Sequence, residues 1–283
     1  MSLPSYTSLH ERIWHYSFLL ICTLVFIFLV FPLLIIIPLS FNALPYFTFT
    51  KEMLSFDPAG YSLEWYQDFF SNPNWQGAVK NSFVIGIFAT LLSTFVGTIA
   101  ALGLSREHMP YRTLITSLLV SPMIVPLIIS AAGMFFFYSR LSMQGTYIGV
   151  ILAHAALGTP FVVITVTATL VGFDNSLIRA AASLGATPTR IFFKIIVPLI
   201  TPGVISGALF AFITSFDEVV VVLFVGSFHQ RTIPWQMFSG MREHISPTIL
   251  AAASLLILIS VILLVTLEWI RRRTERARGI RAT

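Results

Sequence analysis

The sequence predicts an all-α polytopic membrane protein with about six transmembrane helices. Hydrophobic residues make up 56% of its 283 residues, and charged residues make up only 10%. Long apolar runs recur along the chain, and a helix of about 20 residues suffices to cross a hydrocarbon layer of roughly 30 Å. Because no water pairs backbone groups inside a bilayer, each of these runs should be helical. Residues 1–283 are therefore expected to form a single transmembrane domain.

The predicted membrane helices follow one another with mostly short connections. The first, at residues 13–39, is longer than the apolar core of a signal peptide, and no small-residue cleavage site follows it, so we expect a retained helix. Residues 40–75 then interrupt the apolar pattern with Asn, Pro and Gly turn residues. The remaining membrane helices are expected near residues 78–104, 114–138, 145–172, 202–225 and 248–270.

The positions of Lys and Arg predict that both termini are cytoplasmic. With the N-terminus inside, the cytoplasmic side receives most of the cations, including the basic tail at residues 271–283. Cytoplasmic loops of membrane proteins typically carry such an excess. Beside a membrane helix, the tail should contact anionic lipid of the bilayer, and nucleic-acid binding is disfavoured.

The sequence lacks the short motifs of common catalytic and metal sites. It has no G-x-x-x-x-G-K-[ST] phosphate loop, no H-E-x-x-H, and no Cys and His cluster with metal-ligand spacing. His154 is interpreted as a satisfied histidine near the membrane surface, and no metal is expected. The serines lack His and Asp partners at plausible spacing, so an intramembrane enzyme is the weaker alternative. A signalling or scaffold protein is also disfavoured, because only short loops lie outside the apolar runs.

The predicted cytoplasmic segment at residues 174–201 contains more helix caps and turn residues than a simple linker between two membrane helices would need. Its caps and turn residues predict a short helix, a glycine corner with left-handed backbone, and a second helix that two prolines interrupt at the membrane. In chain order these residues are Asp174, Asn175 and Ser176 at the first cap, Gly185 at the corner, Thr187 and Pro188 at the second helix start, and Pro198 and Pro202.

Within that segment, residues 179–186 read R-A-A-A-S-L-G-A, and V-P-L-I-T-P-G follows at residues 197–203. This spacing resembles the EAA loop of ABC importer permeases, which reads E-A-A-x-x-L-G-A, a spacer, and then a Leu-Pro and a Pro-Gly pair. Arg179 stands where that pattern has an acid. The resemblance implies the type I ABC importer permease fold and a coupling helix that inserts into a groove on a cytoplasmic ATPase. The residues it assigns to coupling are Arg179, Ala180, Ala181, Leu184, Gly185 and Ala186.

The resemblance covers most of the chain and is strongest to the polyamine permeases, on pieces such as S-F-D-E at residues 215–218. It implies a bacterial inner-membrane permease that imports spermidine or putrescine with a second, homologous permease. A periplasmic substrate-binding protein would deliver the substrate, and a cytoplasmic ABC ATPase dimer would bind the ATP and Mg, so this chain should need no cofactor. Related permeases leave another amine-type solute as the alternative: an opine, a 4-aminobutyrate-like amine or an aminophosphonate.

Asp217 and Glu218 are adjacent carboxylates in the fifth predicted membrane helix. An acid at the bilayer centre costs about 2.5 to 3.5 kcal/mol on insertion scales, so it is expected to be functional or paired. We favour a substrate pathway over a purely structural pair, because an acid, hydroxyls and an aromatic ring on one helix face suit an amine. The predicted pathway residues are Asp217, Glu218, Phe210 and Thr214, and the same face is expected to hold Gly203 and Ser206.

Overall fold

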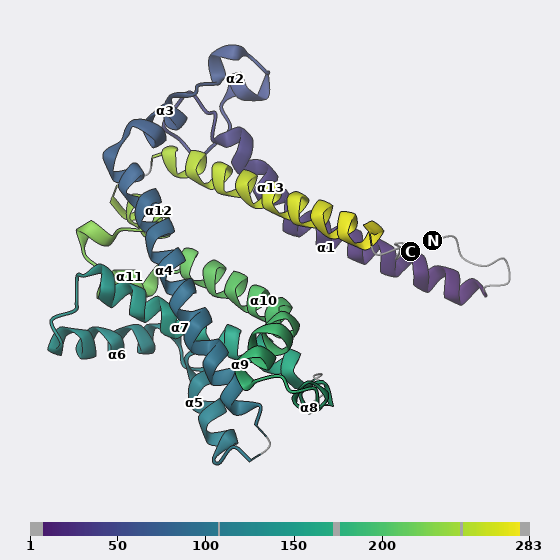
Figure 1. Ribbon diagram of the computed structural model, residues 1–283. Helices are drawn as coiled ribbons and strands as arrows, with labels where there is room; N and C mark the ends of the chain where they lie inside the picture. The colour runs from purple at the N-terminus through teal and green to yellow at the C-terminus, as the bar shows by residue number, and fades with distance from the viewer. Residues whose placement is uncertain (1–7, 107, 172–175, 244–245, 278–283) are drawn as a thin grey trace. The chain divides into compact units, whose positions relative to one another are not determined.

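The computed structural model describes residues 8–106, 108–171, 176–243 and 246–277. Helices dominate these ranges, and the β-structure within them is one isolated bridge between Asn42 and Tyr61 (Figure 1). The chain divides into two compact units. One unit is Pro73–Ser239, and the other joins the residues up to Asn72 with those from Gly240 onward.

The core of the Pro73–Ser239 unit consists of α4 (Pro73–Leu104), α7 (Tyr147–Val171) and α10 (Val197–Phe216), each packed against the other two. On α10, small residues spaced four apart are buried: Gly203, Gly207, Ala211 and Ser215. A Cβ atom at Gly207 would lie 2.8 Å from the Cα atom of Val162 on α7. The absence of a side chain thus lets the two backbones approach closely, as is typical of helix pairs in membranes.

The helix α4 approaches α7 through a similar row of small residues. Ala89, Ser93, Gly97 and Ala101 are buried, again four residues apart. The Ser93 hydroxyl lies 3.0 Å from the Ala155 carbonyl oxygen of α7 and 2.7 Å from the carbonyl oxygen of Ala89. The three helices are therefore held by close backbone packing together with a buried hydroxyl.

The predicted helix at residues 114–138 is divided in the structure. It forms α5 (Arg112–Ile124) and α6 (Leu127–Arg140), which are bent by 104° relative to each other. Val125 is extended, with φ −70° and ψ 132°, because the ring of the following Pro126 disfavours helical backbone at that residue. The expectation of one straight helix here was wrong, and the cause is the proline in the middle of the apolar run.

The segment that begins with α8 leads into α10, and from Pro188 onward the helix has no break. After α8 (Ser176–Ser183) come α9 (Pro188–Ile191), the π-helical turn η2 (Phe192–Ile196) and α10, which together make one helix of 29 residues, Pro188–Phe216. The wider π turn directly precedes Pro198, whose ring would clash with a carbonyl one turn earlier in a regular helix. The prolines therefore widen one turn of this helix and do not end it.

The predicted helix at residues 202–225 is also divided. It ends at Phe216, and a short helix α11 (Val220–Val225) follows after a break at residues 217–219. Beyond α11 come η3 (Phe228–Gln230) and α12 (Ile233–Glu243). Asn81 fastens this connection to α4, because its Nδ2 donates to the carbonyls of His229 and Arg231 at 2.8 and 2.9 Å.

The other unit contains α1 (Leu9–Leu39), α2 (Lys51–Leu54), η1 (Pro58–Gly60), α3 (Glu64–Ser71) and α13 (Thr248–Ala277). Asn42 organises the turns after α1. Its side-chain amide donates to the backbone carbonyls of Tyr46 and Thr48, and its backbone carbonyl accepts from the Trp65 indole. The Thr248 hydroxyl lies 2.7 Å from Oδ2 of Asp68 and so joins the start of α13 to α3.

Within the described ranges, four helices are long and apolar enough to cross a membrane: α1, α4, α7 and Pro188–Phe216. The bent pair α5 and α6 makes a fifth if it is counted as one span. The last predicted helix, at residues 248–270, falls within α13. Some predicted features lie outside the described residues. They are Gly172 at the end of the predicted helix 145–172, the caps Asp174 and Asn175, and the end of the basic tail from residue 278.

Candidate functional site

The predicted corner at Gly185 has the left-handed backbone that its sequence indicates. Gly185 has φ +81°, and it lies two residues after Ser183, the last residue of α8. Its N–H donates to the Ala182 carbonyl at 2.9 Å, and the Ala186 N–H donates to the Ala181 carbonyl at 3.0 Å. These two bonds are the pattern of a Schellman motif, in which a left-handed glycine closes the end of a helix.

The next helix begins where the sequence predicts. The Thr187 side chain accepts from the Arg190 N–H, and Pro188 occupies the first turn of α9. A Cβ at Gly185 would meet nothing within 4 Å, so the constraint at this position comes from its backbone conformation alone.

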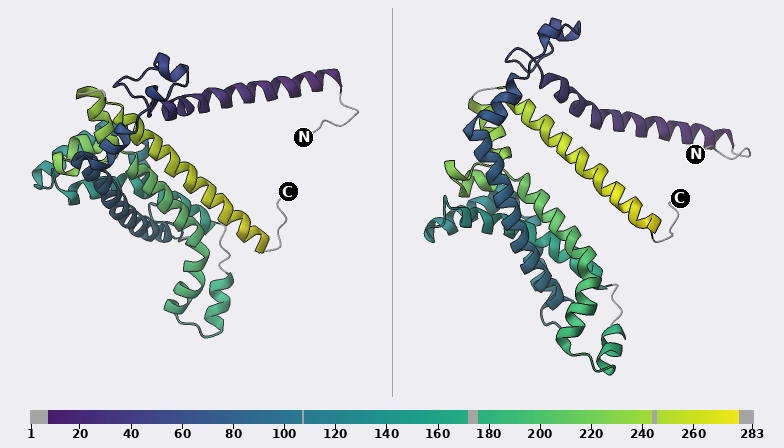
Figure 2. Two further views of the ribbon diagram at one scale, coloured as in Figure 1. Left: turned by 90° about the horizontal axis from the view of Figure 1, so that it is seen from above. Right: turned by 45° about the horizontal axis from the view of Figure 1, so that its top comes forward.

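The corner presents its side chains outward. Leu184 is 88% exposed, and Arg179, Ala180 and Gly185 are exposed as well, whereas Ala181 and Ala186 are half-buried. The structure thus brings the six predicted coupling residues together on one small projection (Figure 2).

Asp217 and Glu218 lie in the break between α10 and α11, not inside a continuous helix, and their environments differ. Asp217 ends α10, with its N–H bonded to the Ile213 carbonyl at 3.0 Å, and its side chain is exposed. Glu218 is only 5% exposed. The two carboxylates therefore point to different surroundings, although they are adjacent in the chain.

Glu218 is bound to the first turn of α11. Its carboxylate oxygens accept from the N–H groups of Val220 at 2.8 Å and Val221 at 2.7 Å. These N–H groups have no partner within a helix, so a carboxylate placed there satisfies them and interacts favourably with the helix dipole. Glu218 thus stabilises the break that exposes Asp217.

The buried side chains of Ser215, His154 and Glu218 form a row of contacts, which sequence reasoning missed. His154, 1% exposed, lies within α7, and its Nδ1 is 2.8 Å from the Ser215 hydroxyl. Its Nε2 faces Oε2 of Glu218 at 3.8 Å. The interpretation of His154 as an interfacial residue was wrong. The available signal was that an ionisable residue inside a membrane segment calls for a partner, and Glu218 called for one too.

The predicted pathway face of α10 is only partly formed as expected. Ser206, Phe210 and Asp217 are exposed, and Thr214 is half-buried. Gly203 belongs to the neighbouring buried row, because a Cβ there would clash with Thr169 of α7. The Phe210 ring stacks on Phe161 with centroids 6.0 Å apart. An aromatic pair and an exposed carboxylate near the end of α10 together suit an organic cation.

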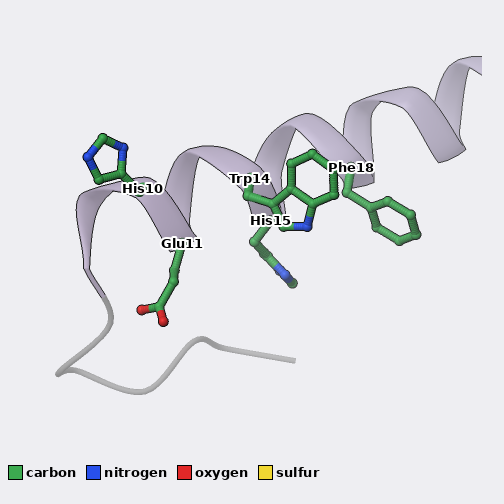
Figure 3. A pocket seen from close by; sticks show the side chains of 5 residues that line it. All are labelled: His10, Glu11, Trp14, His15 and Phe18. Atoms are coloured by element: carbon green, nitrogen blue, oxygen red, sulfur yellow. The ribbon is translucent and has the colours of Figure 1, made fainter.

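A surface depression on α1 is a poor candidate for a binding site. It is lined by His10, Glu11, Trp14, His15 and Phe18 (Figure 3). All five belong to the first turns of α1, so no second element closes the depression. Glu11 is already engaged in a capping box with Ser8. Among the described residues, no group of three or more His, Cys, Asp or Glu side chains could hold a metal ion.

One helix connects the exposed corner to the carboxylate break. The helix Pro188–Phe216 follows the Gly185 corner, and Asp217 comes directly after its last residue. Its 29 residues span about 43 Å, roughly the depth of a bilayer with its headgroups. A displacement of the corner would therefore move the break through a single element.

Comparison with known proteins shows the family of the chain. Residues 93–276 match the family of binding-protein-dependent transport system inner membrane components. The spermidine/putrescine transport system permease protein PotC of Haemophilus influenzae is 31% identical over 251 residues, which cover 89% of this chain and 95% of that protein. The putrescine transport system permease protein PotI of Escherichia coli strain K12 is 30% identical over 250 residues, 84% of this chain and 85% of that protein.

The fold is shared with solved transporters. A crystal structure of a bacterial ABC transporter involved in the import of the acidic polysaccharide alginate has a TM-score of 0.69 at 14% identity, covering 95% of this chain and 99% of that one. At this identity the likeness shows the fold alone. Because the family match extends over more than half of the sequence, the chain belongs to the binding-protein-dependent transport system inner membrane components, as a permease subunit of an ABC importer and not an enzyme.

Proposed function

We propose that this chain is one of two homologous permeases that together import a polyamine such as spermidine or putrescine across a bacterial inner membrane. A periplasmic binding protein delivers the substrate, and an ATPase dimer on the cytoplasmic side binds ATP and Mg and drives transport. Both termini of the permease are cytoplasmic in this proposal, which places the Gly185 corner on the ATPase side.

The continuous helix Pro188–Phe216 is the observation that carries this proposal. Its start holds the exposed corner with Leu184, and its end exposes Asp217. Rearrangement of the ATPase pair would push the corner, and the helix, which is unbroken from Pro188 to Phe216, would transmit that movement to the carboxylate break. Arg179 through Ala186 are the coupling residues in this mechanism.

The substrate assignment is supported by the chemistry of the break and by the names of the relatives. An exposed carboxylate attracts an ammonium group, and Phe210 with Phe161 offers aromatic faces for a cation at the same helix end. Thr214 lies between Phe210 and Asp217 in the sequence, and its half-buried side chain adds a hydroxyl. Relatives about 30% identical are named as permeases for spermidine and putrescine.

The need for a second permease is supported by the apolar surface of the chain. The described side chains of α1 are almost all exposed, and large apolar residues on α4, α5, α6 and α10 are exposed as well. Lipid covers part of this surface. A closed substrate pathway through one membrane, however, requires a second set of helices to face the exposed side of α10.

Reconstituted transport tests the proposal. The permease, with the second permease and ATPase that co-purify with it, is placed in proteoliposomes, and uptake of labelled spermidine or putrescine is measured with the binding protein and ATP. We expect ATP-dependent uptake. Uptake of an opine or an aminophosphonate in preference to both polyamines would favour the alternative substrate class, because those solutes also carry an amine.

Gly185→Val separates coupling from folding. A β-branched residue in left-handed backbone costs on the order of 1 to 2 kcal/mol and re-aims α8. We expect normal membrane insertion but a loss of substrate-stimulated ATP hydrolysis. Gly185→Asn is the matched control, because Asn tolerates this backbone and should retain most of the activity. Wild-type coupling in Gly185→Val would contradict the assigned role of the corner.

A further inference from the structure

The corner and the helix that follows it are basic, with no acid of their own. Residues 176–216 contain Arg179, Arg190 and Lys194 but neither Asp nor Glu. All three cationic side chains are exposed. Among the described residues, no carboxylate lies within ion-pair distance of any of these three cations.

Arg179 is the cation best placed to meet a partner that binds the corner. It lies on α8, one turn before the end of that helix, where its carbonyl accepts from the Ser183 hydroxyl at 3.0 Å. Leu184, which follows Ser183, is 88% exposed. A surface that covers Leu184 and the end of α8 would also come close to the Arg179 side chain.

We propose that the ATPase surface that receives the corner carries a carboxylate opposite Arg179. This inference rests on the proposed function, in which the corner docks on the ATPase. An arginine brought against a protein surface loses part of its hydration, and an opposing carboxylate compensates for that loss while an opposing cation would add repulsion. A partner built for an acid at this position would therefore reject this chain, so the permease and its ATPase form a charge-matched pair.

The test measures ATPase affinity for the permease complex in neutral detergent at several salt concentrations. The variants are Arg179→Glu, Arg179→Ala and Arg179→Lys, all at an exposed position where folding should be unaffected. At low salt we expect Arg179→Glu to weaken binding at least about tenfold and Arg179→Lys to stay within about threefold. Added salt should weaken wild-type binding but strengthen Arg179→Glu binding, because salt screens attraction and repulsion alike.

Two results would overturn the charge pairing. Equal affinities of Arg179→Ala and Arg179→Glu at every salt concentration would show that no charge on the ATPase faces this position. The matched control is Arg112→Glu, which makes the same charge change at an exposed residue outside the corner. An equal loss of affinity in this control would assign the effect to net charge and not to a carboxylate opposite Arg179.

An anionic lipid headgroup is the competing partner, and nanodiscs distinguish it. If Arg179→Glu weakened binding only in nanodiscs containing phosphatidylglycerol, and not in neutral detergent, the lipid would be the partner and the proposal would fail. Leu184→Asp separates this proposal from the docking itself. Loss of binding in Leu184→Asp with full binding in Arg179→Glu rejects the carboxylate alone, whereas wild-type binding in both rejects docking at the corner.

Discussion

At the residue scale, Asp217 and Glu218 are adjacent in the chain, but their side chains lie in different environments. Asp217 is exposed at the end of α10, whereas Glu218 is buried against the N–H groups of α11. We expect Asp217→Asn to reduce polyamine uptake about tenfold or more, because a charged hydrogen bond to an ammonium contributes roughly 1.5 to 3 kcal/mol. Uptake is measured in proteoliposomes at saturating ATP.

Glu218→Gln is the comparison variant for Asp217→Asn. In Gln an NH2 group, which cannot accept from an N–H, replaces one of the two carboxylate oxygens that bind α11, so this change should lower the thermal unfolding midpoint in detergent, whereas Asp217→Asn should leave it unchanged. Normal polyamine uptake by both variants would reject a cation pathway at the break and favour a zwitterionic or anionic substrate.

The buried contact between His154 and Ser215 gives a second prediction at this scale. Ser215→Ala removes the partner 2.8 Å from Nδ1 of His154 and should destabilise the protein by about 1 to 3 kcal/mol. Thermal unfolding in detergent measures the change. Ser206→Ala, an exposed serine of the same helix, is the control and should have almost no effect. Equal midpoints for the two variants would mean that the histidine contact contributes nothing to stability.

At the element scale, the rows of small residues determine how closely α4, α7 and α10 pack. Gly207→Ala places a Cβ 2.8 Å from the Cα atom of Val162, and a backbone atom cannot move aside as a side-chain end can. We expect a loss of about 1 to 3 kcal/mol, measured as a lower unfolding midpoint.

Gly103→Ala provides the matched comparison, because this glycine of α4 has nothing within 4 Å of the added Cβ. It should be neutral or slightly stabilising, since Ala favours a helix over Gly by about 1 kcal/mol. If both substitutions had the same effect, helix propensity and not close packing would govern these positions.

At the scale of the whole molecule, the orientation of the chain can be tested directly. A green fluorescent protein fused after the C-terminus should fluoresce, because that fusion partner folds in the cytoplasm. An alkaline phosphatase fused at Ser142, in the exposed turn after α6, should be active, because it requires the oxidising outer side. The reverse pattern would move the Gly185 corner to the outside and would be incompatible with an ATPase at that corner.

The sequence predicted features that depend on local chemistry. The all-α class, the left-handed Gly185 and the start of α9 at Pro188 follow from composition, glycine and proline, and the structure confirms them. The breaks at Pro126 and Asp217 were missed, because an apolar run has no periodicity that reveals where it bends. His154, Ser215 and Glu218 meet only through tertiary packing, so single-residue reasoning could not find their contact. The assigned roles of the coupling and pathway residues stay predictions.

The packing of α10 also bears on how the chain is made. The chain is synthesised from its N-terminus, so α4 and α7 are made before Gly203 and Gly207, and the surface of α7 that these glycines cover must wait for them. That surface carries Thr165 and Thr169, whose hydroxyls bond back to their own helix, to the carbonyls of Phe161 and Thr165. Before α10 arrives, the part of α7 that these glycines will cover therefore leaves neither the Thr165 nor the Thr169 hydroxyl unpaired in lipid. Assembly then finishes when α10 arrives, and chains arrested before residue 203 should persist in the membrane as inserted but loosely packed helices, sensitive to membrane proteases.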